Sequence, residues 1–293
     1  MIKLGEIQEL ELLEINEHGG YLGLPGSDHG KVSEGAFENG MTELTSILLP
    51  GAQLPAGVAA GDRIRVFVYK DSKDRPIATV REPALTLGGI ARLQVISTSK
   101  IGAFLDWGLE KDLFLPFKEQ TEKLHKGDYV VVSLYIDKSE RLCATMRIYD
   151  KLSSESPYER GSKVHGYIYQ FSDTLGALVA VDLRYHGLIQ KKELFGRHKI
   201  GEEVEARVTG VRRDGRLNLT IRSKAYRQMG DDAEEVYLKI QDLGGRLPFT
   251  DKASPLVIDR EFGLSKAAFK RAVGKLLKEE RIRITEDGIE ILR

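Results

Sequence analysis

The sequence predicts a multidomain, mainly β protein in which three small five-stranded barrels precede a small α/β domain. Three observations support this prediction. Short segments rich in Val, Ile, Leu and Tyr alternate with turn residues, this pattern recurs along the chain, and helix signals replace strand signals after residue 232. The 293 residues are also too many for a single small barrel.

Residues 161–224 show the strand pattern most clearly. Candidate strands occupy 163–171, 177–182, 187–190, 203–211 and 216–222, with period-two alternation along them. Five short strands leave unpaired edges unless the sheet closes, so a small barrel is expected. From residue 161 to Arg227 the segment holds thirteen Lys and Arg against seven Asp and Glu, a net charge of +6.

The glycine and turn residues of segment 88–147 have the same spacing as those of segment 161–222. Residues 102–105 match 176–179, where the first glycine permits a sharp bend before the second strand. In the third strand, 112–115 match 187–190, and 141–145 match 216–220 in the fifth. Residues 1–86 are a degenerate copy with strands at 5–15, 20–24, 44–50, 61–66 and 75–79, interrupted by an insertion at 25–41.

Charge is distributed unevenly, although the net charge of the whole chain is zero. Residues 1–86 carry eight basic and thirteen acidic side chains, a net charge of −5. Residues 87–150 carry nine of each sign, and residues 232–293 carry twelve of each. Electrostatics therefore favours the third segment as the site of any nucleic-acid contact.

The motifs Gly-Ala-Phe-Leu, Leu-Phe-Leu-Pro, Lys-Gly-Asp and Arg-Leu-x-Ala-Thr of residues 87–150 resemble the S1 domain. The S1 domain is a five-stranded OB-fold module that binds RNA. Residues 161–224 show the same resemblance, and residues 1–86 a weaker one. The histidine that is usual in the third strand is replaced by Leu115 and Gln190.

The last segment predicts three helices and a hairpin. A helix is expected over 234–243, a second begins after the N-cap Ser254 with Pro255 in its first turn, and a third spans 266–279 after the N-cap Ser265. The hairpin pairs 281–285 with 289–292. Three helices and a hairpin wing indicate a winged-helix domain. The apolar face of the third helix is expected to contain Phe269, Val273, Leu276 and Leu277.

This domain order resembles the bacterial conserved virulence factor B family. The resemblance implies three five-stranded OB-fold (S1-type) barrels in tandem at 1–86, 87–150 and 158–227, followed by an α/β winged-helix domain at 232–293. It also implies a cytoplasmic bacterial RNA-binding protein with a regulatory role. The acidic first barrel and the winged helix are alternative docking surfaces for a protein partner.

Aromatic residues supply candidates for base stacking. Tyr167 and Tyr169 alternate with inward residues, so both are expected to project from one face of the third barrel and stack on unpaired bases. The alternative is that they cover surface near a domain junction. In the second barrel, one of Phe104, Trp107 and Phe114 is expected to face a ligand while the others pack.

Basic residues supply candidates for phosphate contact. In the third barrel these are Arg184, His186, Lys191, Lys192, Arg212, Arg213 and Arg216, and in the winged helix they are Lys266, Lys270, Arg271, Lys275 and Lys278. Each group has an alternative explanation. The arginines fit a solvated hairpin tip, and a charged face is what any surface helix needs.

Several classes of protein find no support. No apolar run approaches eighteen residues, so no membrane-spanning helix is expected, and the acidic N-terminus does not resemble a targeting peptide. The single Cys143 excludes an internal disulfide and suits a reducing cytoplasm.

Catalytic and metal-binding motifs are also missing. There is no Gly-rich phosphate loop, His-Glu-x-x-His or Gly-x-Ser-x-Gly motif, and the six histidines lack ligand spacing. We therefore expect no enzyme activity, cofactor or metal.

The sequence thus predicts a protein that binds single-stranded RNA mainly through the third barrel, with help from the winged helix. Phosphate attraction by Lys and Arg and stacking on Tyr would supply the affinity. Two alternatives stay open. One is a DNA-binding transcription regulator that acts through the winged helix, and the other is a weak ribonuclease that uses His186.

Overall fold

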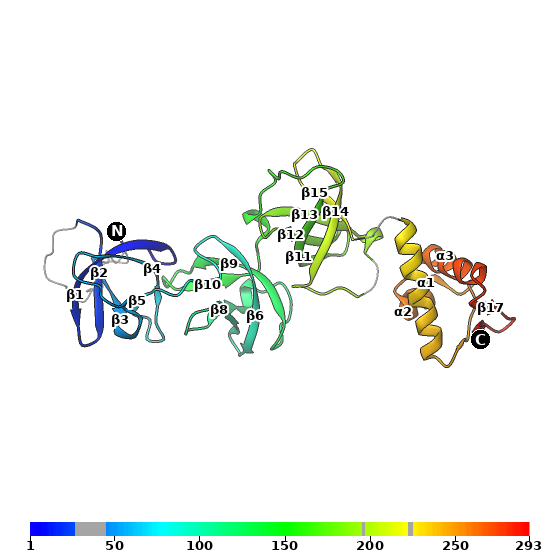
Figure 1. The fold of residues 1–293 in the computed structure, drawn as a ribbon, viewed down its shortest axis with the longest axis horizontal. Helices are drawn as coiled ribbons and strands as arrows, with labels where there is room; N and C mark the ends of the chain where they lie inside the picture. Colours follow the sequence, from blue (N-terminus) through cyan, green and yellow to red (C-terminus); the bar gives the residue numbers. More distant parts are fainter. Residues whose placement is uncertain (27–44, 195–196, 222–224, 293) are drawn as a thin grey trace. The chain divides into compact units, whose positions relative to one another are not determined.

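The computed structural model describes residues 1–26, 45–194, 197–221 and 225–292, with the backbone alone for 192 and 225–231. The expected insertion at 25–41 lies almost wholly outside the described residues. The chain divides into two compact units, Met1–Ser153 and Ser154–Arg293. Two barrels form the first unit, and a third barrel and a helical domain form the second (Figure 1).

The three expected barrels are present, and each is closed. Their strands run in the order first, second, third, fifth, fourth, and the fourth pairs back to the first. The first barrel contains β1 (Ile7–Asn16), β2 (Gly19–Gly23), β3 (Ser46–Pro50), β4 (Arg63–Lys70) and β5 (Pro76–Thr79). The second contains β6 (Ile90–Thr98), β7 (Gly102–Asp106), β8 (Leu113–Pro116), β9 (Tyr129–Ile136) and β10 (Leu142–Thr145). The third contains β11 (Lys163–Ser172), β12 (Gly176–Val181), β13 (Tyr185–Gln190), β14 (Glu203–Val211) and β15 (Leu217–Thr220).

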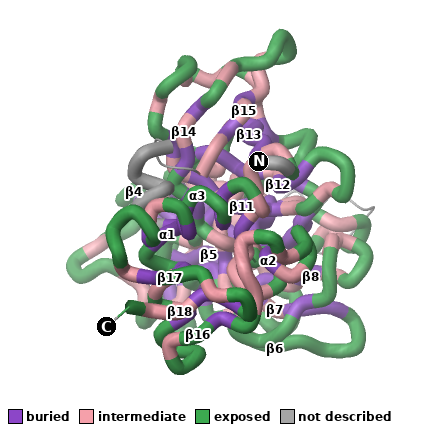
Figure 2. The backbone as a smooth tube through the Cα atoms, turned by 90° about the vertical axis from the view of Figure 1, so that its right-hand side faces the viewer, coloured by how far each residue is buried: buried purple, intermediate pink, exposed green. Residues whose placement is uncertain are grey.

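Alternating apolar side chains fill the interior of each barrel. In the third barrel, Ile168, Val179 and Ile189 come from successive strands and are fully buried. Figure 2 shows buried, intermediate and exposed residues following one another along the chain. Burying a side chain of this size stabilises the fold by about 1.5–3 kcal/mol. The same alternation turns the intervening residues outward, so the outer surface of the barrel is where a ligand-binding face can form.

One hydrogen bond is repeated in all three barrels. A three-residue 3-10 helix follows the third strand, and its last side chain accepts a hydrogen bond from a threonine that ends the fifth strand. The pairs are Thr79 Oγ1 to Gln53 Oε1 at 2.6 Å, Thr145 Oγ1 to Glu119 Oε2 at 2.7 Å, and Thr220 Oγ1 to Glu193 Oε2 at 3.0 Å. This repetition confirms that residues 1–86 are a copy of the same unit.

The glycine that begins each second strand is required by close backbone approach. A Cβ added at Gly19, Gly102 or Gly176 would lie 2.1, 2.3 or 2.2 Å from a carbonyl oxygen of the third strand. No side chain fits at that distance, because real Cβ contacts are longer than 3.0 Å. The predicted bend at these glycines is therefore also a contact between two strands.

The strand register corrects the sequence alignment of the third strand by one residue. Gly102 pairs with Pro116, and its counterpart Gly176 pairs with Gln190. Pro116 therefore corresponds to Gln190, where the sequence alignment placed Leu115. Leu115 is fully buried and belongs to the interior.

A β-bulge interrupts the first strand of every barrel. The register shifts between Leu12 and Glu14, between Val95 and Ser97, and between Ile168 and Gln170. A bulge inserts one residue on one strand only, so the period-two alternation does not continue across it. Tyr169 is the residue inserted in the third barrel.

Trp107 lies buried where the first and second barrels meet. Its ring makes edge contacts with Phe67 at 5.7 Å and Tyr69 at 6.4 Å between centroids, and both rings belong to β4. The indole Nε1 donates a hydrogen bond to the Lys111 carbonyl oxygen at 2.6 Å. Trp107 is 3% exposed and packs against another barrel, so of the three aromatic residues Phe104, Trp107 and Phe114 it is one that packs.

Charged groups close the same junction. Lys111 Nζ donates to the Asp71 carbonyl oxygen at 2.7 Å and lies 3.3 Å from the Asp74 carboxylate. Arg141 lies 3.9 Å from the same carboxylate. The turn between β4 and β5 is therefore used to hold the second barrel.

The C-terminal domain has the predicted winged-helix elements. These are α1 (Ala225–Asp242), α2 (Pro255–Phe262), α3 (Lys266–Lys278) and the sheet of β16 (Arg246–Leu247), β17 (Ile282–Ile284) and β18 (Ile289–Ile291). Ser254 and Ser265 cap α2 and α3 by accepting hydrogen bonds from Val257 N and Ala268 N, as predicted.

Two details of this domain differ from the prediction. The first helix begins at Ala225 rather than at 234, so it is longer than predicted and starts before the expected domain boundary. Leu277 is 37% exposed, whereas Phe269, Val273 and Leu276 are buried. The buried face of α3 is completed by Ala268 and Ala272.

We predict that Trp107→Ala will lower the free energy of unfolding of the first unit by about 3–5 kcal/mol, because it leaves a cavity between two barrels. Urea unfolding followed by far-ultraviolet circular dichroism measures this change. Trp107→Phe is the matched control and should lose less. An unchanged urea midpoint for Trp107→Ala would show that the junction contributes nothing to stability.

Candidate nucleic-acid interface

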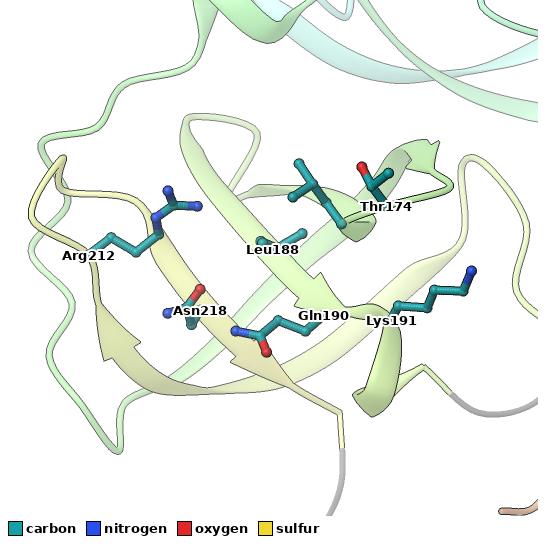
Figure 3. Close-up of a pocket in the computed structure, with 7 residues that line it drawn as sticks. Thr174, Leu188, Gln190, Lys191, Arg212 and Asn218 are labelled. Carbon is teal, nitrogen blue, oxygen red and sulfur yellow. The ribbon is translucent and has the colours of Figure 1, made fainter.

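The third barrel has a hollow of about 440 Å³ on its outer surface, lined by Thr174, Leu175, Leu188, Gln190, Lys191, Arg212 and Asn218 (Figure 3). These residues come from the β11–β12 turn, the third and fifth strands, the 3-10 helix that follows β13, and the β14–β15 turn. OB-folds bind oligonucleotides on the face of strands two and three, between these same two turns. The hollow is therefore the candidate binding site.

Strand pairing sets the floor of this site. Leu178 pairs with Leu188, and Leu188 pairs with Asn218, so these side chains form one row across β12, β13 and β15. Gln190 lies two residues further along β13. Their neighbours Ile189 and Leu219 point into the core, and this alternation turns the amides of Gln190 and Asn218 outward.

Two cations border the site from opposite sides (Figure 3). Lys191 Nζ donates to the Asp173 carbonyl oxygen at 3.1 Å. Arg212 begins the β14–β15 turn, where its backbone N donates to the Arg216 carbonyl oxygen at 2.8 Å. The Arg212 guanidinium lies 3.6 Å from the Asp214 carboxylate and is exposed. An anionic ligand would thus meet positive charge at both edges.

Arg212 occupies a position where the other two barrels carry a carboxylate. The backbone hydrogen bond that closes this turn starts at Asp71, Asp137 and Arg212 in the three barrels. Asp71 Oδ1 and Asp137 Oδ1 each accept two backbone N–H groups of their own turns. In the third barrel Asp214 takes over part of this role by accepting from Arg216 N at 3.2 Å. The charge at the edge of the site is therefore inverted in this barrel alone.

The fourth strand of the third barrel also leaves more open space beside the fifth strand than its counterparts in the first two barrels. Ile77, Cys143 and Asn218 pair with Tyr69, Tyr135 and Gly210. A Cβ added at Gly210 would meet nothing within 4 Å. In the first two barrels a tyrosine therefore lies beside the fifth strand, whereas in the third barrel Gly210 leaves this position without a side chain.

Tyr167 and Tyr169 do not lie together on the outer face of the third barrel, as the sequence predicted they would. Tyr169 is 1% exposed, so the expectation that it projects from the barrel is wrong. The bulge between Ile168 and Gln170 breaks the alternation on which that expectation depended. Tyr167 is half-buried on the outer face, where its ring makes an edge contact with His165 at 5.0 Å.

The other predicted residues of the third barrel fall into two groups. Tyr167, Ala180 and His186 form one cross-strand row, and the exposed Arg184 lies in the adjacent β12–β13 turn. His186 is 7% exposed, which leaves little of its ring accessible. Lys191 and Arg212 line the hollow, and Arg213 and Arg216 lie in the same β14–β15 turn as Arg212. The side chain of Lys192 lies outside the described residues.

The second barrel carries an aromatic pair on the equivalent face. Phe104 pairs with Phe114 across β7 and β8, and their ring centroids are 5.4 Å apart. Both rings are half-buried. The residue next to them on β10 is Cys143, which is 2% exposed and lies 3.8 Å from Asp137 Oδ2. This face is therefore apolar and bordered by a carboxylate.

In the winged helix, the exposed face of α3 holds Lys270, Arg271 and Lys278. Lys266 and Lys275 lie at the sides of the helix and are half-buried. Lys270 is 3.7 Å from Asp251, and Lys275 is 3.7 Å from Glu279. Arg271 and Lys278 form no ion pair within the described residues, so they are the cations best placed for an external anion.

The prediction from sequence missed the neutral floor of the hollow, formed by Leu188, Gln190 and Asn218. A signal was present for Gln190, because it stands where an S1 domain usually has a histidine. The inversion from Asp137 to Arg212 was also visible once the two final hairpins are aligned at Arg141 and Arg216.

The described residues contain no group of three His, Cys, Asp or Glu side chains that could hold a metal ion. No helix in the described part of the chain is long and apolar enough to cross a membrane.

Comparison with protein families covers nearly the whole chain. The S1 domain matches residues 4–81 and 87–147, the second domain of the virulence regulatory factor CvfB matches 152–223, and the CvfB-like winged helix domain matches 234–291. Tandem S1-type barrels joined to a winged helix define a multidomain nucleic-acid-binding regulator.

Within that class, the chain belongs to the conserved virulence factor B family. A family member from Staphylococcus epidermidis is 30% identical over 80% of this chain and 81% of its own length. One from Staphylococcus aureus is 27% identical over 80% of each chain. The crystal structure of a multidomain protein with nucleic acid binding domains from Streptococcus pneumoniae has the same fold, with a TM-score of 0.50 and 22% identity over 99% of this chain and 98% of that one.

We predict that Cys143 will not react with a thiol reagent in the folded protein. Burial, followed by the nearby Asp137 carboxylate, raises the pKa of the thiol to about 11, so the reactive thiolate is scarce at neutral pH. The measurement is colour release from a disulfide reagent before and after urea is added. Asn218→Cys places a thiol at the equivalent position of the third barrel and should react in the folded state. Rapid labelling of native Cys143 would contradict this prediction.

Proposed function

We propose that this protein binds single-stranded RNA through the outer face of β12, β13 and β15. The observation that carries the proposal is Arg212, which places a guanidinium at the edge of the OB-fold face where the other barrels have Asp71 and Asp137. A guanidinium holds phosphate through paired hydrogen bonds, whereas a carboxylate repels it.

The same face supports contact with bases as well as phosphates. Gln190 and Asn218 each offer an amide donor and acceptor to a base edge. Leu188 supplies an apolar surface between them. Tyr167 lies at the other end of the strands, in a row with His186 and beside the turn that holds Arg184. Rows two residues apart along a strand are separated by roughly 6.6 Å, so the face can follow several nucleotides of an extended strand.

The winged helix supports this function from its α3 helix. Lys270, Arg271 and Lys278 share its exposed face and would add phosphate contacts. The wing is less suited to that role, because Arg283 is 2.7 Å from Glu290 and Arg246 is 3.6 Å from both Glu290 and Asp287.

The first barrel supports binding indirectly. Its β4–β5 turn is occupied by Lys111 and Arg141 of the second barrel, and its segment carries a net charge of −5. We infer that it is a structural support for the second barrel rather than an RNA-binding module. Its acidic surface also suits a protein partner, as does the winged helix. The family relationship favours a cytoplasmic regulator and not an enzyme.

We predict that Arg212→Ala combined with Lys191→Ala will weaken binding of single-stranded RNA and flatten its salt dependence. Two lost phosphate contacts reduce the log–log slope by about 1.4, since each contact to a single strand contributes roughly 0.7. RNA affinity across a salt series measures the slope. The double variant Lys3→Ala and Lys73→Ala removes the same charge from the first barrel and should keep it. A full slope in the Arg212 variant would place the phosphate contacts elsewhere, at α3 first.

The same titrations with duplex DNA test the alternative of a DNA-binding regulator, which requires duplex DNA to bind more tightly than single-stranded RNA. A gel of the RNA after several hours tests the ribonuclease alternative. Shortening of the RNA that is lost in His186→Ala would establish that activity and overturn the assignment as a binding protein only.

We predict that Tyr167→Ala will weaken RNA binding by roughly 1–3 kcal/mol and leave the salt slope unchanged, because stacking releases no counterions. Tyr21→Ala, on the outer face of the first barrel, is the control and should bind like the wild type. If a folded Tyr167→Ala protein also binds like the wild type, stacking occurs at Phe104 and Phe114 instead.

A further inference from the structure

The second barrel has a separate hollow of about 430 Å³, away from the face of Phe104 and Phe114. It lies where β7 ends and β9 begins, beside the segment that links the first two barrels. The Phe104 face extends instead toward the start of β7, near the β6–β7 turn. The hollow is thus distinct from the OB-fold site.

Three side chains form a cross-strand row in this hollow. Gln94 on β6 pairs with Tyr129 on β9 and with Asp106 on β7. Directly opposed side chains lie about 4.5–5.5 Å apart on the same face of a sheet. Leu93 and Val95 are buried on either side of Gln94, which turns the row outward.

One end of the row is a flat stacking surface. The guanidinium of Arg92 lies over the Tyr129 ring, with its central carbon 3.9 Å from the ring centroid. Tyr129 is 38% exposed, and Trp107 forms part of the wall of the hollow. Proteins hold unpaired bases by stacking them on aromatic rings and on guanidinium planes.

The other end of the row is a hydrogen-bonding edge. Asp106 Oδ1 accepts the backbone N–H of Gly108 at 3.0 Å, which holds the carboxylate in place. Within the described residues, Asp106 Oδ2 and the Gln94 carboxamide form no hydrogen bond. Acceptor and donor capacity is therefore available next to the stacking surface.

We propose that this hollow binds a guanine base. The Watson–Crick edge of guanine carries two adjacent N–H donors, which suit one carboxylate, and next to them a carbonyl oxygen, which suits an amide N–H. Adenine and cytosine present an unprotonated ring nitrogen on that edge, which would face the Asp106 carboxylate unfavourably. Uracil has only one donor there.

The other barrels lack this combination at the equivalent row. The first barrel has Arg63, Glu11 and Gly23, and the third has Glu203, Tyr167 and Ala180. Only the second barrel places an aromatic ring, a carboxamide and a carboxylate in line. The inference does not depend on RNA binding by the third barrel, because no residue is shared with that site.

The sequence supplies a reporter for this site. Trp107 is the only tryptophan in the chain and is one wall of the hollow, so its fluorescence should respond to a bound base. We expect saturable fluorescence change when GMP is added to the full-length protein, with affinity for AMP at least about tenfold weaker. IMP lacks the exocyclic amine of GMP and should fall between them.

Asp106→Asn separates the base-edge contact from folding. Asparagine keeps the acceptor for Gly108 N–H but replaces the second carboxylate oxygen with an N–H donor, which opposes the donors of guanine. Affinity for GMP should fall by about 10–100-fold, whereas affinity for AMP should not fall, because the new N–H donor can face the unprotonated ring nitrogen of adenine. Lys3→Ala, in the first barrel and not among the residues that line the hollow, should leave GMP binding unchanged. Equal affinities for GMP and AMP, or wild-type affinity in folded Asp106→Asn, would overturn the proposal, as would no response to any nucleotide at millimolar concentration.

Oligonucleotides identify the source of the base. A pentauridylate with one central guanosine is compared with one carrying a central adenosine. If the guanosine oligomer binds more tightly than the adenosine oligomer and Asp106→Asn removes the difference, the hollow reads a guanosine within a strand. If the two oligomers bind equally while GMP still binds more tightly than AMP, the site takes a free guanine nucleotide. Tighter binding of the adenosine oligomer would contradict the guanine assignment.

Discussion

Every barrel in this protein depends on the pairing of its fourth strand with its first. That pairing closes the sheet and removes the edges that five short strands would otherwise expose. Closure also fixes which side chains face outward, because each strand has neighbours on both sides. The candidate sites in the second and third barrels exist because closure brings residues distant in sequence, such as Gln94 and Tyr129, into one row.

Duplication of one unit allows each copy to differ at the same few positions. The turn between the fourth and fifth strands begins with Asp71 in one barrel, where it helps to dock a neighbour, and with Arg212 in another, where it borders an open hollow. Internal contacts such as the hydrogen bond from Thr220 to Glu193 stay the same in all three copies. The positions that differ between the copies therefore lie in the turns and outer rows, and the contacts that stay the same lie in the repeated interior.

The period-two pattern of apolar residues predicted all three barrels and most strand limits. It could not predict the bulge near Tyr169, because an inserted residue changes alternation without changing composition. The one-residue error in the alignment of the third strand arose differently. Leu115 and Pro116 both fit a strand end by residue type, so composition could not decide between them. The position of Trp107 could not be predicted for another reason. Its partner rings at Phe67 and Tyr69 belong to a different barrel, and pairing between domains leaves no local signal.

The winged helix was predicted more accurately at its caps than at its start. Ser254, Pro255 and Ser265 are local signals that act within one turn of helix. No comparable signal marks the beginning of α1 at Ala225, because the residue before it in the sequence is Lys224.

The burial of Trp107 has a consequence for synthesis of the chain. Phe67 and Tyr69 leave the ribosome before Trp107 does, and domains generally fold in that order. The first barrel can thus be complete when the tryptophan emerges and can receive it immediately. Removal of the first barrel would leave the second barrel with an exposed indole during its own assembly, because Phe67 and Tyr69 would no longer be there to cover the ring.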